Sequence, residues 1–200
     1  MKRGFMNQLR WIFLFMTFAF CGFLGLPNVW GQTDTTPSAV SEPLTPYTNK
    51  VENVSFLIPK TWNLKELNQK GQGYFICAAA VRPLKDPLDG FGEMVNLVVA
   101  DLSPDTTLDR YMEENIKNLN IGLKEFKVEK KEAVNSGNAQ GKYLVYSHQV
   151  PTIAPRLKMM VFLFVKNNKG YALTCTSTAK KFSTYEEMFQ AIGKSFKFNG

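Results

Sequence analysis

The sequence predicts an α+β domain in which a central antiparallel sheet of about six or seven strands has helices packed on its faces. Three observations predict this fold class. Seven segments have the length and composition of strands, two segments repeat apolar residues with the 3.6-residue period of a helix, and the strands come in runs. Runs of strands broken by one helix favour antiparallel pairing over a doubly wound parallel sheet.

Three strands are predicted before the first helix, at residues 51–58, 74–81 and 93–102. The first strand ends at Pro59, which cannot donate a ladder hydrogen bond, and Trp62 after it is expected to cover one end of the core. The polar segment 63–73 is interpreted as a connection. The third strand, EMVNLVVADL, is nearly continuous in apolar residues, which is typical of a strand inside a sheet.

Two amphipathic helices are predicted from the spacing of apolar residues. The apolar face of the first contains Leu108, Tyr111, Met112, Ile116 and Leu119. Thr106 and Asp109 have the spacing of a capping box, and Gly122 is placed to end this helix. The last helix is expected to open with the capping box of Ser183 and Glu186. Its apolar face contains Tyr185, Met188, Phe189, Ile192 and Phe196.

Four further strands are expected to form two hairpins between the helices. The segments FKVEKKEAV and KYLVYSHQV flank NSGNAQG, whose asparagine and glycine residues suit a turn. The segments LKMMVFLFVK and YALTCTST flank NNKG in the same way. These hairpins complete the predicted sheet.

The first 31 residues have the organisation of a secretory signal peptide. Three basic residues and no acid precede the uncharged run WIFLFMTFAFCGFLGL, and small residues stand at a cleavage site. We expect cleavage between Gly31 and Gln32. The protein is therefore expected to be exported to the periplasm or to another extracytoplasmic or lumenal space.

Two alternatives to cleavage remain open. The apolar run, extended through Pro27 to Trp30, just reaches the ~20 residues that a membrane anchor needs. Cys21 is a second candidate, as a lipidated cysteine, although Phe20 occupies the preceding position where a lipobox has a small residue.

Residues 32–50, QTDTTPSAVSEPLTPYTNK, are rich in Thr, Ser and Pro, and we interpret them as a disordered spacer or a frayed N-terminus. The folded domain is then expected at residues 51–200. Removal of the leader would lower the formal net charge of the chain from +7 to +4. This mild positive balance is compatible with peripheral association with an anionic membrane or with an acidic partner. No basic stripe with interleaved aromatic residues is present, so nucleic acid is not an expected partner.

Cys77 and Cys175 remain after cleavage, and both fall in predicted strands. A disulfide between them would close a loop of about 100 residues and add roughly 4–5 kcal/mol in the loop-entropy model. The alternative, which we favour, is that they are two small buried apolar side chains. Sequence spacing does not give the Cα separation that decides between the two.

No catalytic, metal-binding or cofactor-binding constellation is predicted. A nucleophilic dyad would need His148, the one histidine of the chain, beside a cysteine that lies among apolar neighbours, where a thiolate is disfavoured. The acids around Asp86 and Asp89 lack the spacing of a calcium loop, and the glycines form no phosphate-binding loop. We therefore expect a protein that is not an enzyme and has no cofactor.

The loop RPLKDPLDGFGE, residues 82–93, is the surface most expected to contact a partner, together with the hairpin tips. Loops that are held on a rigid sheet carry binding residues in many folds. The candidate docking residues are Arg82, Lys85, Asp86, Asp89 and Phe91.

Several of these segments together resemble the PsbP-like family. They are a strand that ends at Pro59 before Trp62, the strand MVNLVVADL leading into TTLDRYMEENIKNL, two hairpins, the strand GYALTCTST, and Phe182 and Tyr185 before a closing Ser195-Phe196. The resemblance covers about residues 50–198. It implies the fold shared with DcrB-type bacterial envelope proteins and the yeast Ran-binding factor, a central antiparallel sheet with helices on its faces and no catalytic residues.

The resemblance and the leader together predict an exported, non-catalytic accessory protein that docks to a protein partner in an envelope or membrane complex. A photosystem II extrinsic subunit is one alternative that the resemblance implies, although the histidines discussed for metal binding in PsbP relatives have no match beyond His148. A small-ligand-binding envelope protein with a pocket between sheet and helices is another. A purely structural domain without a partner is a third.

Overall fold

The computed structural model describes residues 41–84, 90–150 and 155–200. The predicted signal peptide, its cleavage site at Gly31 and Gln32, and Cys21 lie outside the described residues. The same holds for Lys85, Asp86 and Asp89 of the predicted docking loop. These predictions remain predictions.

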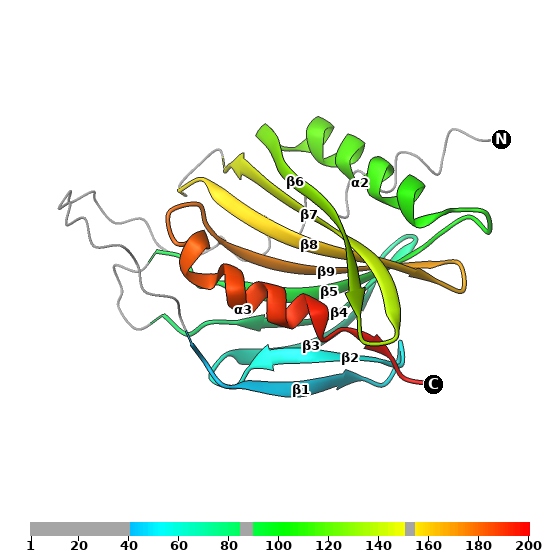
Figure 1. Ribbon diagram of the computed structural model, residues 1–200, viewed down its shortest axis with the longest axis horizontal. Coiled ribbons are helices and arrows are strands. Elements are labelled where there is room, and N and C mark those ends of the chain that lie inside the picture. Colours follow the sequence, from blue (N-terminus) through cyan, green and yellow to red (C-terminus); the bar gives the residue numbers. More distant parts are fainter. Residues whose placement is uncertain (1–40, 85–89, 151–154) are drawn as a thin grey trace.

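The central sheet of the structure has seven strands, and every neighbouring pair in it is antiparallel (Figure 1). The strand order is β3-β4-β5-β9-β8-β7-β6. Their bounds are β3 Asn63–Lys70, β4 Tyr74–Val81, β5 Met94–Asp101, β6 Lys124–Ser136, β7 Ala139–Gln149, β8 Leu157–Lys166 and β9 Lys169–Thr178. The predicted α+β class and both predicted hairpins are confirmed.

A second, three-stranded sheet stands beside the first, in the order β1-β2-β10. Its strands are β1 Leu44–Asn49, β2 Val54–Pro59 and β10 Lys197–Phe198. The predicted first strand therefore belongs to this small sheet and not to the central one. The prediction of a spacer at 32–50 is wrong for residues 44–49, because Tyr47 is buried against Phe56, with ring centroids 5.3 Å apart. Pro46 is tolerated because β1 is an edge strand.

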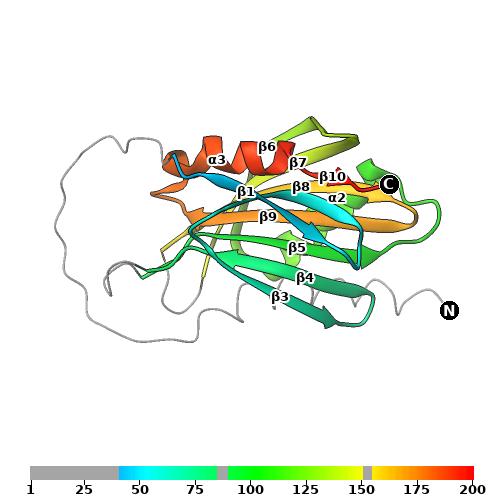
Figure 2. The ribbon, with the colours of Figure 1, turned by 90° about the horizontal axis from the view of Figure 1, so that it is seen from below.

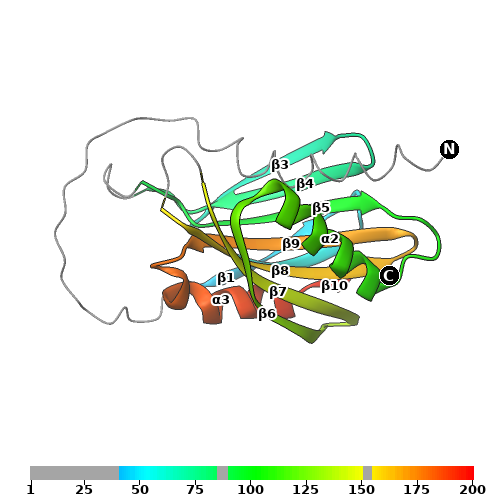
Figure 3. The same ribbon diagram turned by 90° about the horizontal axis from the view of Figure 1, so that it is seen from above.

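The two faces of the central sheet are covered by different elements (Figures 2 and 3). Helix α3, Phe182–Lys194, and the small sheet cover one face and enclose the larger hydrophobic core. Helix α2, Leu108–Gly122, packs on β6, β7 and β8 at the other face and encloses a smaller core. The residues of both predicted apolar helix faces lie in or against these two cores, although Phe196 lies beyond the end of α3.

The sequence predicts a connection at residues 63–73, and this prediction is wrong because residues 63–70 form strand β3. β3 lies at the edge of the central sheet, and all its side chains except that of Leu67 are exposed. A strand with few buried side chains leaves no alternating apolar pattern to recognise. A bulge between Glu66 and Gln69, with Asn68 at a φ of +46°, interrupts its pairing with β4.

The helix starts also differ from the predicted capping boxes. Thr107, not Thr106, caps α2, and its hydroxyl accepts a hydrogen bond from the backbone N–H of Arg110 at 3.2 Å. The N-cap of helix α3 is Lys181, two residues before the predicted Ser183, so Ser183 lies inside the helix and forms no cap. The physical reason is Phe182, which is buried against Phe189 and joins the first turn of the helix to the core.

Gly193 lets α3 approach the central sheet closely. A Cβ atom at this position would overlap the ring of Phe162, which is fully buried on β8. The carbonyl of Gly193 also accepts a hydrogen bond from the hydroxyl of Ser136 on β6, at 2.9 Å. The distance between α3 and the sheet is therefore set at this residue.

We predict that Gly193→Ala lowers the free energy of unfolding by about 1–3 kcal/mol, because the added methyl group overpacks the contact with Phe162. This loss is expected although alanine is the better helix former. Urea unfolding measures it. Gly90→Ala is the matched control, since nothing lies near a Cβ atom there, and it should stay within about 0.5 kcal/mol of the parent. An unchanged Gly193→Ala variant would contradict the prediction.

Candidate functional site

The root of the loop between β4 and β5 is held by a buried ion pair. The Nε atom of Arg82 donates to the carboxylate of Glu93, and the side chains are 9% and 0% exposed. The other guanidinium nitrogens donate to the carbonyls of Pro83 and Phe91 at 3.3 and 3.2 Å. Backbone pairing continues here as well, because the N–H of Arg82 donates to the carbonyl of Glu93 at 2.8 Å.

This arrangement corrects the prediction for Arg82, which holds the base of the loop and does not offer its charge at the surface. A guanidinium has several donors in a planar fork, so a single arginine can tie together both ends of the loop. Phe91 is half-buried and keeps its place as a candidate contact residue. Leu84, which the sequence analysis did not select, is 54% exposed at the same end of the molecule.

The loop root also contacts helix α3. Burial raises the pKa of Tyr185 to about 12, and the negative charge of Glu93 contributes to this shift. Tyr185 in turn packs edge-on against Trp62, with ring centroids 6.5 Å apart. The loop therefore stands on a rigid base formed by β4, β5 and α3.

The two cysteines do not form the disulfide that the sequence left open, because both thiols are free and buried. Cys77 lies on β4 and Cys175 on β9, and β5 runs between these strands. Two strand spacings of about 4.8 Å exceed the Cα separation of about 7 Å that a disulfide can bridge. Burial raises the pKa of Cys77 to about 12 and that of Cys175 well above its ordinary value.

His148 lies on the opposite face of the sheet from both cysteines. Its neighbours along β7, Leu144 and Tyr146, belong to the core under α2, whereas Cys77 and Cys175 belong to the core under α3. The structure therefore does not assemble a Cys–His dyad. His148 is 1% exposed, and neither ring nitrogen makes a hydrogen bond of ordinary geometry to another described residue.

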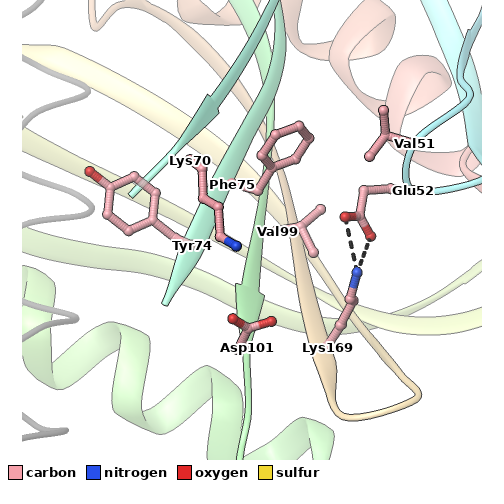
Figure 4. A pocket seen from close by; sticks show the side chains of 8 residues that line it. All are labelled: Val51, Glu52, Lys70, Tyr74, Phe75, Val99, Asp101 and Lys169. Carbon is pink, nitrogen blue, oxygen red and sulfur yellow. Dashed lines mark hydrogen bonds and ion pairs between the residues drawn. The ribbon is translucent and has the colours of Figure 1, made fainter. Parts of the chain in front are cut away.

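A pocket of about 270 Å³ opens at the other end of the central sheet from the loop root, between the two sheets (Figure 4). The β1–β2 turn overhangs it with Val51 and Glu52. The remaining lining comes from the β3–β4 hairpin, the end of β5 and the start of β9. These residues are Lys70, Tyr74, Phe75, Val99, Asp101 and Lys169.

An ion pair closes one side of this pocket. The ammonium group of Lys169 donates to both carboxylate oxygens of Glu52, at 2.8 and 3.0 Å. Glu52 is 7% exposed and Lys169 39% exposed. The bond joins residues 117 positions apart and so ties the small sheet to the β8–β9 hairpin across the pocket.

No residue of this pocket is among the site residues predicted from the sequence. The signal in the sequence is weak, because residues 63–73 are predicted as a connection and Glu52 as part of a strand. Alternating charges in hairpin turns are also common at any protein surface. Only the packing of the small sheet onto the central one brings Glu52 to Lys169.

The described residues contain no group of three or more side chains of the kinds that hold a metal ion. Among the helices that the structure describes, none has both the length and the hydropathy of a membrane span.

The structure predicts a large cost for removing one partner of the buried pair. Arg82→Met would leave Glu93 as an unpaired buried charge, so the free energy of unfolding is expected to fall by about 3–5 kcal/mol. Replacing both residues, as Arg82→Met/Glu93→Met, should recover part of that loss. Arg110→Met is the control, since Arg110 pairs with Glu114 at 62% and 42% exposure, and it should cost less than about 1 kcal/mol. If Arg82→Met lowers the free energy of unfolding by less than about 1 kcal/mol in denaturant unfolding, the interpretation of a buried ion pair is wrong.

The free energy of unfolding is expected to depend on pH through His148. Burial lowers its pKa in the folded state, the nearby backbone of Gln149 partly offsets this shift, and the Arg156 cation adds to it. Below the unfolded-state pKa of about 6.5 the unfolded chain binds a proton that the folded chain does not. The stability of the parent relative to His148→Leu should therefore fall as the pH drops from about 7.5 to 5.5, by up to about 1.4 kcal/mol per pH unit. Equal pH slopes for the two proteins in urea unfolding would contradict this.

One family model matches most of the chain. The family model described as PsbP matches residues 42–198. No curated protein matches the chain by sequence.

Three solved structures share the fold. The cyanobacterial PsbP (CyanoP) from Synechocystis has a TM-score of 0.56 and 14% identity, covering 84% of this chain and 98% of its own. The Ran-binding protein Mog1p from Saccharomyces cerevisiae has a TM-score of 0.55 and 10% identity, covering 79% and 96%. LpqN from Mycobacterium tuberculosis, described as involved in cell envelope biogenesis, has a TM-score of 0.52 and 14% identity, covering 82% and 90%.

At such identities the structural likeness supports the fold alone. The family model, however, spans both sheets and the described helices α2 and α3, from residue 42 before β1 to Phe198 at the end of β10. The chain therefore belongs to the PsbP family.

Proposed function

We propose that this chain is an exported, non-catalytic accessory protein that docks to a protein partner in an envelope or membrane complex. The observation that carries the proposal is the loop root, where Arg82 and Glu93 hold a loop with the exposed side chain of Leu84 on a rigid base. Binding residues concentrate on loops that a rigid scaffold positions. An apolar side chain at such a site can serve as an anchor in a partner's pocket.

Family membership supports the same proposal at a general level. Mog1p is named as a Ran-binding protein, which is a protein-binding role on this fold. LpqN is described as involved in cell envelope biogenesis, which fits an extracytoplasmic place of action. The predicted leader supports export, and the net charge of +4 after its removal supports an acidic partner surface or peripheral membrane association.

The alternative of a photosystem II extrinsic subunit rests on the family match and on the likeness to CyanoP. It differs from the main proposal only in the partner. The two are separated by the identity of the protein that the docking loop captures from the source membranes.

The test is a pull-down with residues 32–200, which contain the whole described fold, from detergent extracts of the source membranes. We expect mass spectrometry to identify one stoichiometric partner. Loss of this partner at high salt would show that the net positive charge of the chain contributes to docking. Leu84→Ser should abolish the capture. Ile121→Ser is the matched control, because Ile121 is 53% exposed at the end of α2, and it should leave the capture unchanged.

Two results would overturn the proposal. One is the absence of an enriched partner at either salt concentration. The other is a partner whose capture is insensitive to Leu84→Ser, to Phe91→Ser and to charge reversal at Lys85, Asp86 and Asp89. In that case the contact surface is not this loop.

A further inference from the structure

The pocket between the two sheets contains two charged side chains, Asp101 and Lys70, that form no ion pair with another described residue. In the ladder between β5 and β9, Asp101 lies directly opposite Lys169. The ammonium group of Lys169 nevertheless bonds both oxygens of Glu52, which is far less exposed. Asp101 is thereby left without an ion pair among the described residues.

Lys70 is the second unpaired charge of the pocket. It pairs in the ladder with Phe75, and Phe75 pairs with Val99. Within the described part of the chain, Lys70 takes part in no ion pair. Figure 4 shows the Lys70 ammonium group and the Asp101 carboxylate on the side of Val99 that faces away from the Glu52–Lys169 pair. A positive and a negative group therefore border the same space.

The floor of this space is apolar. Val99 belongs to the larger core and Phe75 packs partly buried against it. Val51 overhangs the opening and is 64% exposed, so it offers a further apolar surface. The volume of about 270 Å³ lies just below the usual range of ligand pockets, about 300–1,000 Å³, which favours a small ligand.

The charges of the pocket select among ligand types. Glu52 and Asp101 balance Lys70 and Lys169, so the pocket has no net charge. A simple cation would leave Lys70 unpaired beside it, and a simple anion would leave Asp101 unpaired. A ligand with both charges a few bonds apart satisfies both groups, and each contact would be a charge-assisted hydrogen bond.

We propose that this pocket binds a small zwitterion with an apolar side chain, which is the chemistry of a free α-amino acid. The ligand carboxylate lies against Lys70 and the ligand ammonium group against Asp101. The apolar side chain covers Phe75 and Val99 below Val51. The Glu52–Lys169 pair closes the far wall and keeps Lys169 from neutralising Asp101.

This site is separate from the docking loop. Tyr74 at the pocket end of β4 and Val81 at the loop end are seven residues apart in an extended strand, which is roughly 23 Å. The proposal does not rest on the proposed docking function, and Leu84→Ser should leave ligand binding unchanged. The docking proposal and the ligand-binding proposal can therefore be contradicted independently of each other.

The first test uses L-leucine and two fragments of it. 3-Methylbutylamine has the ammonium group but no carboxylate, and 4-methylpentanoate has the carboxylate but no ammonium group. Isothermal titration calorimetry on residues 32–200 should show binding of L-leucine and at least tenfold weaker binding of either fragment, since each loses one charge-assisted contact. No binding of leucine, or equal binding of all three compounds, would overturn the proposal.

The second test changes the two unpaired charges. Lys70→Gln and Asp101→Asn should each weaken leucine binding about tenfold or more. Lys70→Gln should also remove the preference for leucine over the amine, and Asp101→Asn the preference for leucine over the acid, which a loss of structure would not do. Lys65→Gln and Asp105→Asn, exposed positions outside the pocket, are the matched controls. Equal weakening by the controls would contradict the assignment.

Discussion

The aromatic contact between Phe196 and the central sheet is the constraint on which the rest of the structure depends. Its ring stacks on that of Phe164 with centroids 4.2 Å apart and planes 7° apart, and it also contacts Tyr171 and Phe198. Stacked and edge-on aromatic pairs bury large apolar areas in fixed geometries. Phe196 thus fixes the point where the chain leaves α3 and enters β10.

Two consequences follow from the position of β10. It pairs with β2, so it holds the small sheet against the central one, and the hydroxyl of Ser195 accepts the backbone N–H of Leu57 at 2.8 Å. The β1–β2 turn is tied down by a hydrogen bond between the N–H of Asn199 and the carbonyl of Asn53 at 2.8 Å. This turn carries Glu52, so the pocket depends on packing at the C-terminus. At the opposite end, the same core under α3 supports the loop root through Tyr185.

Most of the fold could be predicted from sequence, because its main elements have strong local patterns. The strands β5 and β8 are almost continuously apolar, β9 follows the NNKG turn, and the helices α2 and α3 repeat apolar residues on one face. Strand β1 is not predicted because Pro46 and the Thr- and Pro-rich composition around it favour a spacer, and β3 because nearly all its side chains are exposed. Strand β10 is not predicted because two residues form no pattern. Ser183 does not cap α3, because the burial of Phe182 outweighs the local hydrogen bond of a capping box. Here tertiary packing overrides a local sequence preference.

The same distinction between local sequence patterns and tertiary contacts applies to the candidate sites. The sequence by itself determined the α+β class, both helix faces, the hairpins and the resemblance to the PsbP family, since these follow from periodicity and turn chemistry over short distances along the chain. Only the tertiary structure decided that Arg82 is a buried anchor, that Cys77 and Cys175 are separated by β5, and that Glu52 meets Lys169 over a pocket. The physical reason is that ion pairs, strand order and pockets depend on contacts between residues far apart in sequence, which the packing of the two sheets fixes.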